Sequence, residues 1–555
     1  MTDSTSPRSR RRWLSLVVIS VAVALIIVDS TIVNVAIPSV VDELSLSSTQ
    51  VQWVQESYTL VFAALLLVLG TLGDRFGRRR ILLAGVSLFA LASIAAALAP
   101  TGEFLIAARV VQGLGGAAIL PSTLSIINST FTGRERGIAF AVWGSTIGGM
   151  AAVGPLLGGW LTTAFSWRWA FGINIPLGVL LVIGILVAVA ESRGPQDEGI
   201  DLVGAAISVV LFTSLVFGLI EGRTYGWFFS DTPPDFWTWS ISPIPFSFAI
   251  AALALVAFVL WGRAREKRGK TAMVPIGLLR IPSFRNGNIT ATIVALGEFG
   301  IILSLPLWLQ DVLGYDALGT GFVLLALAGG SFLASGFAGA SSGRIPAVWV
   351  VRAGLVAEVA GLIVIGSVIA VDTPWWWIAI GLAIYGFGVG LATAQLTSVI
   401  LVDVPVEASG RASGTQSTAR QVGSALGIAI LGTVLFGSLG SQLSSQLPDA
   451  IPADSRTQIV DAVVGSAGGA IPQLEQSLID KAPNVPGIQQ IAADAADAAR
   501  ASFSDATRIA AFTAAGFLAL GLVFSASLGS GRARDEDAEG DATQDGTPAA
   551  TGTTH

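Results

Sequence analysis

Long apolar segments follow one another along most of this 555-residue chain, and short polar stretches separate them. An α-helix rises about 1.5 Å per residue, so about 20 apolar residues cross the hydrocarbon core of a bilayer. The pattern therefore predicts fourteen membrane-spanning helices. Their expected ranges are 14–37, 51–73, 81–99, 104–128, 137–161, 169–190, 202–220, 244–262, 287–310, 319–339, 347–371, 375–398, 413–438 and 506–528.

The first apolar segment has a second interpretation, a cleaved signal peptide, because Arg10, Arg11 and Arg12 precede it. It is too long for the apolar region of such a peptide, contains Asp29 and lacks a clear cleavage site between small residues. We therefore expect a membrane span.

Most of the Lys and Arg residues fall on one side of the predicted membrane. Basic loops stay in the cytoplasm, so this bias predicts a multi-pass protein of the cell (inner or plasma) membrane with both termini cytoplasmic. An even number of helices agrees with that orientation.

Two connections on the predicted outer side are longer than turns. Residues 221–243 are rich in Trp and Pro, which fits an aromatic belt at the membrane interface. Residues 439–504 are polar and Ala-rich, with helical stretches around 486–504, and we expect a soluble amphipathic cap. The alternative is a domain that docks a partner.

Composition excludes several kinds of chemistry. Charged residues make up only 12% of the chain, against roughly 25% in soluble domains. There is no cysteine and the one histidine is His555, so metal ligation by these residues and Ser-His-Asp catalysis have no groups to use. No G-x-x-x-x-G-K-[ST] phosphate loop is present, and no basic face is long enough for a nucleic acid. We expect no cofactor, no metal and no nucleic-acid partner.

A weak internal repeat divides the chain into related halves. Four positions recur 266 residues apart: Gly70 and Gly336, Gly73 and Gly339, Gly77 and Gly343, Arg78 and Arg344. Transporters are often built from such halves, with the substrate site between them. The expected parts are a basic N-terminal tail at 1–13, a six-helix bundle at 14–190, two linker helices at 191–286, a second six-helix bundle at 287–528 that includes the outer insert 439–504, and a disordered acidic tail at 529–555.

Several motifs carry a resemblance to a known family. The basic turn at 70–80, GTLGDRFGRRR, resembles the signature loop of the major facilitator superfamily of transporters. Further stretches resemble its fourteen-helix drug:proton antiporter branch; they lie at 28–38, 109–117, 154–159, 167–176 and 410–423. The resemblance covers 13–438 and 506–528. It implies an all-α integral membrane protein with the major facilitator fold, two six-helix bundles plus two inserted helices.

Two charged residues are expected deep in the membrane at similar depth. Asp29 lies in the first predicted helix and Arg109 in the fourth. A charge at a helix centre costs about 2.5–3.5 kcal/mol to insert, which pairing offsets. We expect one polar network facing the central cavity, which protonation of Asp29 loosens; a static structural pair is the alternative.

Glu56 is the candidate substrate residue. It lies about one turn inside the second predicted helix, beside Trp53 and Tyr58. A carboxylate between aromatic rings suits a lipophilic cation, and the resemblance implies the same role; a Glu that reaches outer water is the alternative. Asn34 and Gln112, from the first- and fourth-helix motifs, complete the predicted substrate site.

Glu298 and Glu358 are further candidates for the coupling proton. They lie deep in the ninth and eleventh predicted helices. Burial disfavours the charged form of a carboxyl, which allows proton exchange near working pH. Arg420, in the thirteenth helix, is expected to have a structural or gating role.

Two motifs are candidates for gating. In the fifth helix, small residues allow close packing and a proline permits bending; these are Gly154, Pro155, Gly158 and Gly159. Plain helix packing is the alternative. In the basic turn, Asp74 is expected to meet a helix N-terminus and Arg78 an acid of another helix, so that the inner face closes. The gate residues of this turn are Gly70, Asp74, Arg75, Gly77 and Arg78; the alternative is that the arginines only fix the topology.

These features predict proton-coupled efflux of small, lipophilic, cationic compounds by alternating access. One alternative is export of an endogenous metabolite, antibiotic or lipid by the same machinery. Remote alternatives are a membrane-embedded enzyme, for which no cluster of catalytic acids or histidines is found on a loop, and a scaffold whose outer cap binds a partner.

Overall fold

The computed structural model describes most of the chain. The described residues are 7–46, 48–193, 201–230, 237, 239–270, 272–274, 276–341, 344–405, 408–483 and 485–528. The predicted tail at 529–555 lies outside them. Within the described part every element is a helix, apart from an isolated antiparallel bridge between Phe229 and Ile241.

Twelve helices among the described residues are long and apolar enough to cross a membrane. They lie within α1 (Pro7–Leu44), α2 (Ser48–Phe76), α3 (Arg78–Ala97), α4 (Gly102–Thr130), the pair α6 (Arg168–Gly172) and α7 (Asn174–Ala188), α8 (Leu202–Tyr225), α9 (Pro243–Lys267), α12 (Ala317–Ser341), α13 (Ala347–Val368), α14 (Trp375–Leu401), α15 (Ser409–Gln446) and α18 (Ile488–Phe524). The two remaining expected positions hold α5 (Gly133–Ala164) and α11 (Pro282–Asp311), of 32 and 30 residues. The all-helical fold is confirmed, while the total of fourteen spans stays a prediction.

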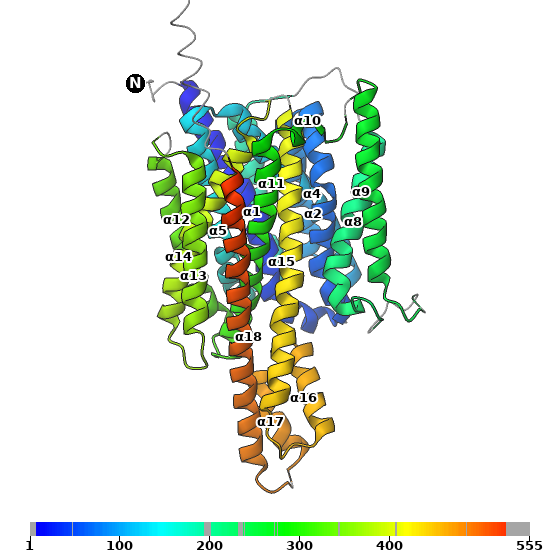
Figure 1. Ribbon diagram of the computed structural model, residues 1–555, viewed down its shortest axis with the longest axis vertical. Coiled ribbons are helices and arrows are strands. Elements are labelled where there is room, and N and C mark those ends of the chain that lie inside the picture. Colours follow the sequence, from blue (N-terminus) through cyan, green and yellow to red (C-terminus); the bar gives the residue numbers. More distant parts are fainter. Residues whose placement is uncertain are drawn as a thin grey trace, which may run out of the picture.

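The long helices run roughly parallel to one axis (Figure 1). The early helices pack among themselves, α1 on α5 and α7, and α4 on α2 and α3. The late ones do the same, α13 on α14, and α11 on α15 and α18. Between the two groups, α5 contacts α12 and α14, and α2 contacts α15. These contacts form the boundary between the early and the late helices.

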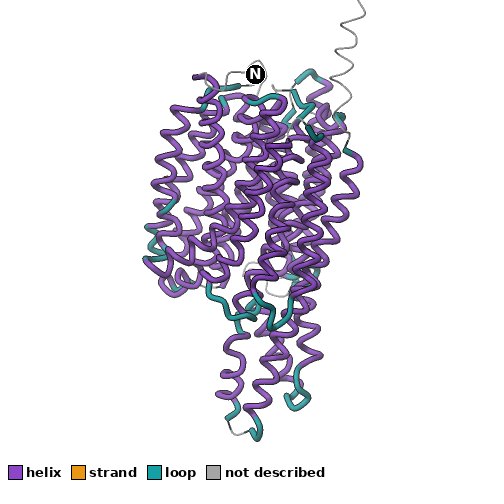
Figure 2. Tube along the Cα trace, turned by 90° about the vertical axis from the view of Figure 1, so that its left-hand side faces the viewer, coloured by secondary structure: helices purple, strands orange, loops and turns teal. Residues whose placement is uncertain are grey.

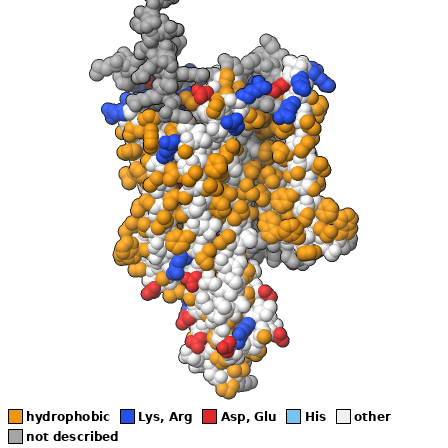
Figure 3. All heavy atoms as spheres, in the orientation of Figure 1, with side chains coloured by type: hydrophobic (Ala, Val, Ile, Leu, Met, Phe, Trp, Pro, Cys, Tyr) orange, Lys and Arg blue, Asp and Glu red, His pale blue; other side chains and the backbone are white. Residues whose placement is uncertain are grey.

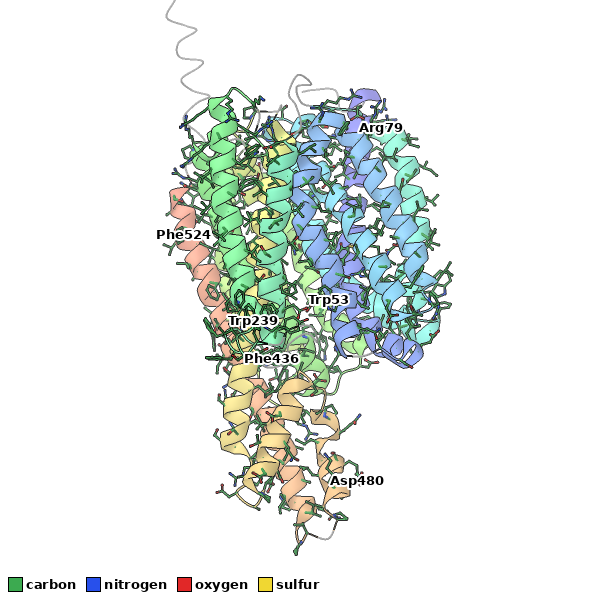
Figure 4. All side chains as sticks on the ribbon, turned by 90° about the vertical axis from the view of Figure 1, so that its right-hand side faces the viewer. Trp53, Arg79, Trp239, Phe436, Asp480 and Phe524 are labelled. Atoms are coloured by element: carbon green, nitrogen blue, oxygen red, sulfur yellow. The ribbon has the colours of Figure 1, made fainter. Side chains whose placement is uncertain are left out.

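The two ends of the bundle differ in charge. Lys and Arg side chains gather at the end that also carries the start of α1, and hydrophobic side chains cover the middle (Figure 3). We call this end, where Arg79 lies (Figure 4), the basic end; Arg75 and Arg78 belong to the same turn between α2 and α3. The opposite end carries a helical extension and is called the insert end.

The insert is an extension of the last helices. α15 and α18 continue past the rest of the bundle, and α16 (Ala453–Gly465) and α17 (Ile471–Lys481) pack against them (Figures 1 and 2). Trp308 at the insert end of α11 donates a 3.0 Å hydrogen bond to Ser504 of α18. The helical stretch predicted at 486–504 is thus the first half of α18, continuous with the last span.

α8 and α9 pack on each other at one edge of the bundle (Figure 1). α8 also contacts both α2 and α15, so it covers the boundary between the early and late helices on this side. Pro243 stands in the first turn of α9, where a proline costs no hydrogen bond, and Ser242 caps that turn. This explains how a helix starts at the crowded prolines of 243–245.

Candidate functional site

A buried ion pair lies at the centre of the early helices. Arg109 Nη1 of α4 lies 2.6 Å from Asp29 Oδ2 of α1. The side chains are 2% and 0% exposed. Because the bilayer and the apolar interior offer neither group water, each is the partner that makes the burial of the other tolerable.

The carboxylate of Asp29 has further donors. Asn174 Nδ2 of α7 donates to Asp29 Oδ1 over 2.7 Å, and Gln112 Nε2 of α4 over 3.2 Å. Gln112 also donates to Ser93 of α3 over 2.8 Å. Amide groups on α4 and α7 thus accompany Arg109 around this carboxylate, and the hydrogen bonds of the network join α1, α3, α4 and α7. The network is enclosed by helices and its acid is fully buried.

Arg109 is held on its other sides by α2. Its Nε donates to the carbonyl of Val54 over 3.1 Å, and its guanidinium carbon lies 4.3 Å from the ring centroid of Tyr58. The ring face of Tyr58 attracts the cation. Tyr58 therefore contacts Arg109, whereas the sequence analysis grouped it with Glu56.

Glycines allow the helices around this network to approach closely. A Cβ on Gly113 of α4 would come within 2.7 Å of the carbonyl oxygen of Tyr58. On α5, a Cβ on Gly154 would collide with Thr31 of α1, and one on Gly158 would come within 2.9 Å of Ile32. The glycine motif of α5 is therefore seated on α1 within one turn of Asp29.

A second carboxyl network occupies the late helices. Glu298 Oε2 of α11 lies 3.3 Å from Arg420 Nη2 of α15, and Glu298 Oε1 accepts a 2.9 Å hydrogen bond from Thr393 of α14. Tyr385 donates to the main-chain carbonyl of Glu298 over 3.1 Å. Glu298 and Asp29 thus have comparable settings, since each lies on the first helix of its group and pairs with an arginine.

Glu358 of α13 is fully buried near the second network. Glu298 and Arg420 are the charged groups that act on it. Among the described residues neither of its carboxyl oxygens has a hydrogen-bond partner. Without a donor among these residues, Glu358 has a different setting from the ion-paired Asp29.

Glu56 contacts an acid that the sequence analysis missed. Its carboxyl group lies against that of Glu221 on α8, and Glu221 is 1% exposed. Trp53, one turn before Glu56, lies toward the insert end of the bundle (Figure 4). The signal that could have found Glu221 is an acid just past the apolar run 202–220. The side chain of Asn34, also predicted for this site, lies outside the described residues.

The basic turn joins the early and late helices. Asp74 of α2 accepts main-chain hydrogen bonds from Gly410 over 2.8 Å and Arg411 over 3.0 Å, at the start of α15. A carboxylate at a helix N-terminus is favoured by the exposed N–H groups and the helix dipole. Arg78 pairs with Asp74 over 2.8 Å. The acid that Arg78 pairs with therefore lies four residues earlier in the same turn, and it is Asp74 that reaches the start of α15.

Backbone geometry supports this junction. Gly77 has φ 111°, a left-handed conformation that favours glycine, and it sets the turn between α2 and α3. A Cβ on Gly70 would come within 2.6 Å of the carbonyl oxygen of Gly410, so α2 and α15 touch at their backbones. Nearby, Asn128 of α4 donates to Ser409 over 2.9 Å. The two groups of helices are therefore in contact at the basic end.

Comparison with known proteins identifies the family. A model described as Major Facilitator Superfamily matches residues 19–428. The chain belongs to this superfamily of membrane transporters, which excludes the enzyme alternative.

Two relatives agree with this assignment. The "Probable actinorhodin transporter" of Streptomyces coelicolor is 32% identical over 420 residues, 74% of this chain and 70% of the relative. "Multidrug resistance protein Stp" of Mycobacterium tuberculosis is 32% identical over 403 residues, 72% of each chain. They support the predicted resemblance to the drug-exporting branch.

A solved structure confirms the fold. The crystal structure of the human organic anion transporter MFSD10 (TETRAN) aligns with a TM-score of 0.57 and covers 94% of this chain and 100% of that one. The two sequences are 13% identical, so this likeness concerns the fold alone.

Proposed function

We propose that the chain exports small lipophilic cations from the cell in exchange for protons. Efflux of drugs or antibiotics by a major facilitator protein is supported by the relatives, whose names describe an antibiotic transporter and a multidrug resistance protein. Proton coupling is the further step, and it depends on the buried carboxyl groups.

The observation that carries proton coupling is the ion pair between Asp29 and Arg109. Charged Asp29 is held by Arg109 and two amide donors, and a proton on Asp29 would remove the attraction and leave Arg109 without its counter-ion. Such a pair has two arrangements that differ in helix packing, which is what a protonation-driven switch requires. Glu298 with Arg420, and Glu358, are candidate proton sites in the other half.

In this proposal, Asp74 closes the substrate cavity on one of the two sides of the membrane. With the basic end in the cytoplasm, as the positive-inside rule indicates, the contact of Asp74 with the start of α15 shuts the inner side. Breaking that contact would open the cavity inward. The glycine contacts of Gly154 and Gly158 with α1 would let α5 move with the helix that carries Asp29.

A cationic substrate is proposed because Glu56 of α2 has aromatic neighbours in sequence and another acid beside it. A lipophilic cation gains from a carboxylate and from aromatic faces. The transmembrane potential adds about 2.3 kcal/mol per charge per 100 mV to the driving force.

A second candidate is export of an antibiotic or another product made by the same cell. It is favoured by the relative named as an actinorhodin transporter. The mechanism would be the same, and only the substrate would differ.

Dye extrusion tests the proposal. Cells expressing the chain are loaded with a fluorescent lipophilic cation, and its loss is followed with and without an uncoupler. Extrusion that stops with the uncoupler is expected, and Glu56→Gln should lower it while Glu103→Gln, at an exposed acid of the same end, should not. Extrusion that continues at full rate after the gradient collapses would contradict proton coupling.

A further inference from the structure

Two acids meet where the inserted helix α8 packs on α2. The carboxyl group of Glu56 lies beside that of Glu221, where α2 packs on α8. Glu221 is 1% exposed, and the Oε2 atom of Glu56 is buried without a hydrogen-bond partner among the described residues. The pair lies at the boundary between the early and late helices, because α8 also contacts α15.

Two carboxyl groups can form a hydrogen bond only if one of them carries a proton, since a carboxylate has acceptors and no donor. If both were charged they would repel each other strongly in this apolar setting. The contact is therefore consistent with one proton held by the pair, and such a pair titrates as a unit.

Other titratable groups lie on α8 itself and on the helices that pack near it. Arg223 and Tyr225 follow Glu221 on α8, and Tyr225 is close enough to be influenced by both acids. On α2 the other charged residues, Asp74 and Arg75, lie at the basic end. The charged residues of the neighbouring helices are Arg411 and Arg420 on α15, Glu103 and Arg109 on α4, and Arg263, Arg265, Glu266 and Lys267 on α9.

Of these, Arg109 is turned toward Asp29 and Arg420 toward Glu298. The charged residues of α9 lie in its last turns, at the end opposite its start at Pro243. Among the side chains that the structure describes, the charged group beside Glu56 is thus another carboxyl.

We propose that Glu221 is a further proton-carrying residue of the transport reaction, which shares one proton with Glu56 and brings the inserted helix α8 directly into the cycle. This rests on the proposed proton-coupled export. Binding of a cation at Glu56 would release the shared proton, which then leaves toward the open side. Loss of the proton without a cation would drive α8 and α2 apart at this end.

The other end of α8 is held by a separate set of contacts, which do not involve Glu56 or Glu221. Asp201 accepts hydrogen bonds from Gly204 N and from Trp261 Nε1 of α9, each over 2.9 Å, and lies 3.5 Å from Arg265. Separation at the Glu56–Glu221 contact would therefore tilt α8 about a fixed base rather than release it.

Proton release tests the inference. The purified full chain is placed in weakly buffered detergent solution with a pH indicator dye, and tetraphenylphosphonium is added. We expect wild type to release protons and Glu56→Gln or Glu221→Gln each to release one proton fewer per molecule. The double variant should lose no more than either single variant, because the pair holds one proton. Full release from Glu221→Gln, or additive losses, would overturn the inference.

Two controls separate this from a structural effect. Glu103→Gln removes an exposed acid at the same end and should leave release unchanged. Glu221→Asp keeps the carboxyl and should restore release. If the Gln variants fail to fold, the infrared band of a protonated carboxyl in wild type should shift in Glu221→Asp, and an unshifted band would refute the shared proton.

The outcomes also separate this inference from the proposed function. If dye extrusion is driven by the proton gradient while Glu221→Gln releases as many protons as wild type, only the role of Glu221 falls. If Glu221→Gln releases fewer protons while dye extrusion does not depend on the proton gradient, the shared proton is supported and proton-coupled export is contradicted.

Discussion

Arg109 makes three kinds of contact from one planar side chain. It pairs with Asp29, donates to the carbonyl of Val54 and lies over the ring of Tyr58. The single ammonium group of lysine lacks the planar guanidinium, which can make all three contacts at the same time. The residue at 109 should therefore be sensitive to its shape as well as to its charge.

Arg109→Lys should lower the initial rate of dye extrusion by about tenfold or more, because loss of about 1.4 kcal/mol of stabilisation already corresponds to tenfold. The measurement is extrusion at matched expression. Arg508→Lys is the control, since Arg508 lies on α18 near the insert end in a half-exposed pair with Asp505. Wild-type rates in Arg109→Lys would show that charge alone suffices.

Gly154→Ala should reduce both stability and transport. The added Cβ would collide with Thr31 on α1, and overpacking costs about 1–3 kcal/mol. Thermal unfolding in detergent and extrusion rate are the two measurements. Gly516→Ala on α18 is the matched control, because a Cβ there meets nothing within 4 Å. Equal behaviour of the two variants would contradict the close packing of α5 on α1.

Helices α8 and α9 are an added pair, and the contacts that hold the start of α8 to α9 can be tested directly. Asp201 caps α8 and binds α9 through Trp261, and it is 4% exposed. Removal of a buried capping acid leaves N–H groups without acceptors. The packing of α8 on α9 at this end should therefore depend on the carboxylate of Asp201.

Asp201→Ala should destabilise the protein by about 1–3 kcal/mol, seen as a lower thermal unfolding temperature. Asp316→Ala is the control, because Asp316 caps the start of α12 in the same way but is exposed. Its effect should be the smaller. A larger decrease in unfolding temperature for Asp316→Ala than for Asp201→Ala would contradict this role of Asp201.

The elements were predictable to the extent that they depend on local pattern. Apolar length placed the spans, and the matched depth of Asp29 and Arg109 followed from helix rise. Helices extend past the predicted ends because polar residues continue them outside the bilayer, as in α15 and α18. Asn174 and Glu221 were missed as site residues, because their contacts with Asp29 and Glu56 join distant segments that only tertiary packing brings together.

At the scale of the whole molecule, contacts at the basic end hold the early and late helices together. Asp74 caps α15, and Asn128 binds Ser409 across the same boundary. Alternating access requires that these contacts break in every cycle. A covalent bond between the early and late helices at the basic end should therefore stop transport.

The cysteine-free sequence makes this testable without background thiols. A disulfide formed in the double variant Asn128→Cys with Ser409→Cys should abolish extrusion, and a reducing agent should restore it. Each single variant under oxidising conditions is the control. Undiminished extrusion by the crosslinked protein would contradict opening at the basic end.

The central claim is that a proton on Asp29 links the gradient to substrate movement. The direct measurement is transport by Asp29→Asn in proteoliposomes, comparing gradient-driven accumulation of a lipophilic cation with its exchange between equal pH on both sides. The account predicts that exchange survives while gradient-driven accumulation is lost. Gradient-driven accumulation at the wild-type level in Asp29→Asn would contradict it.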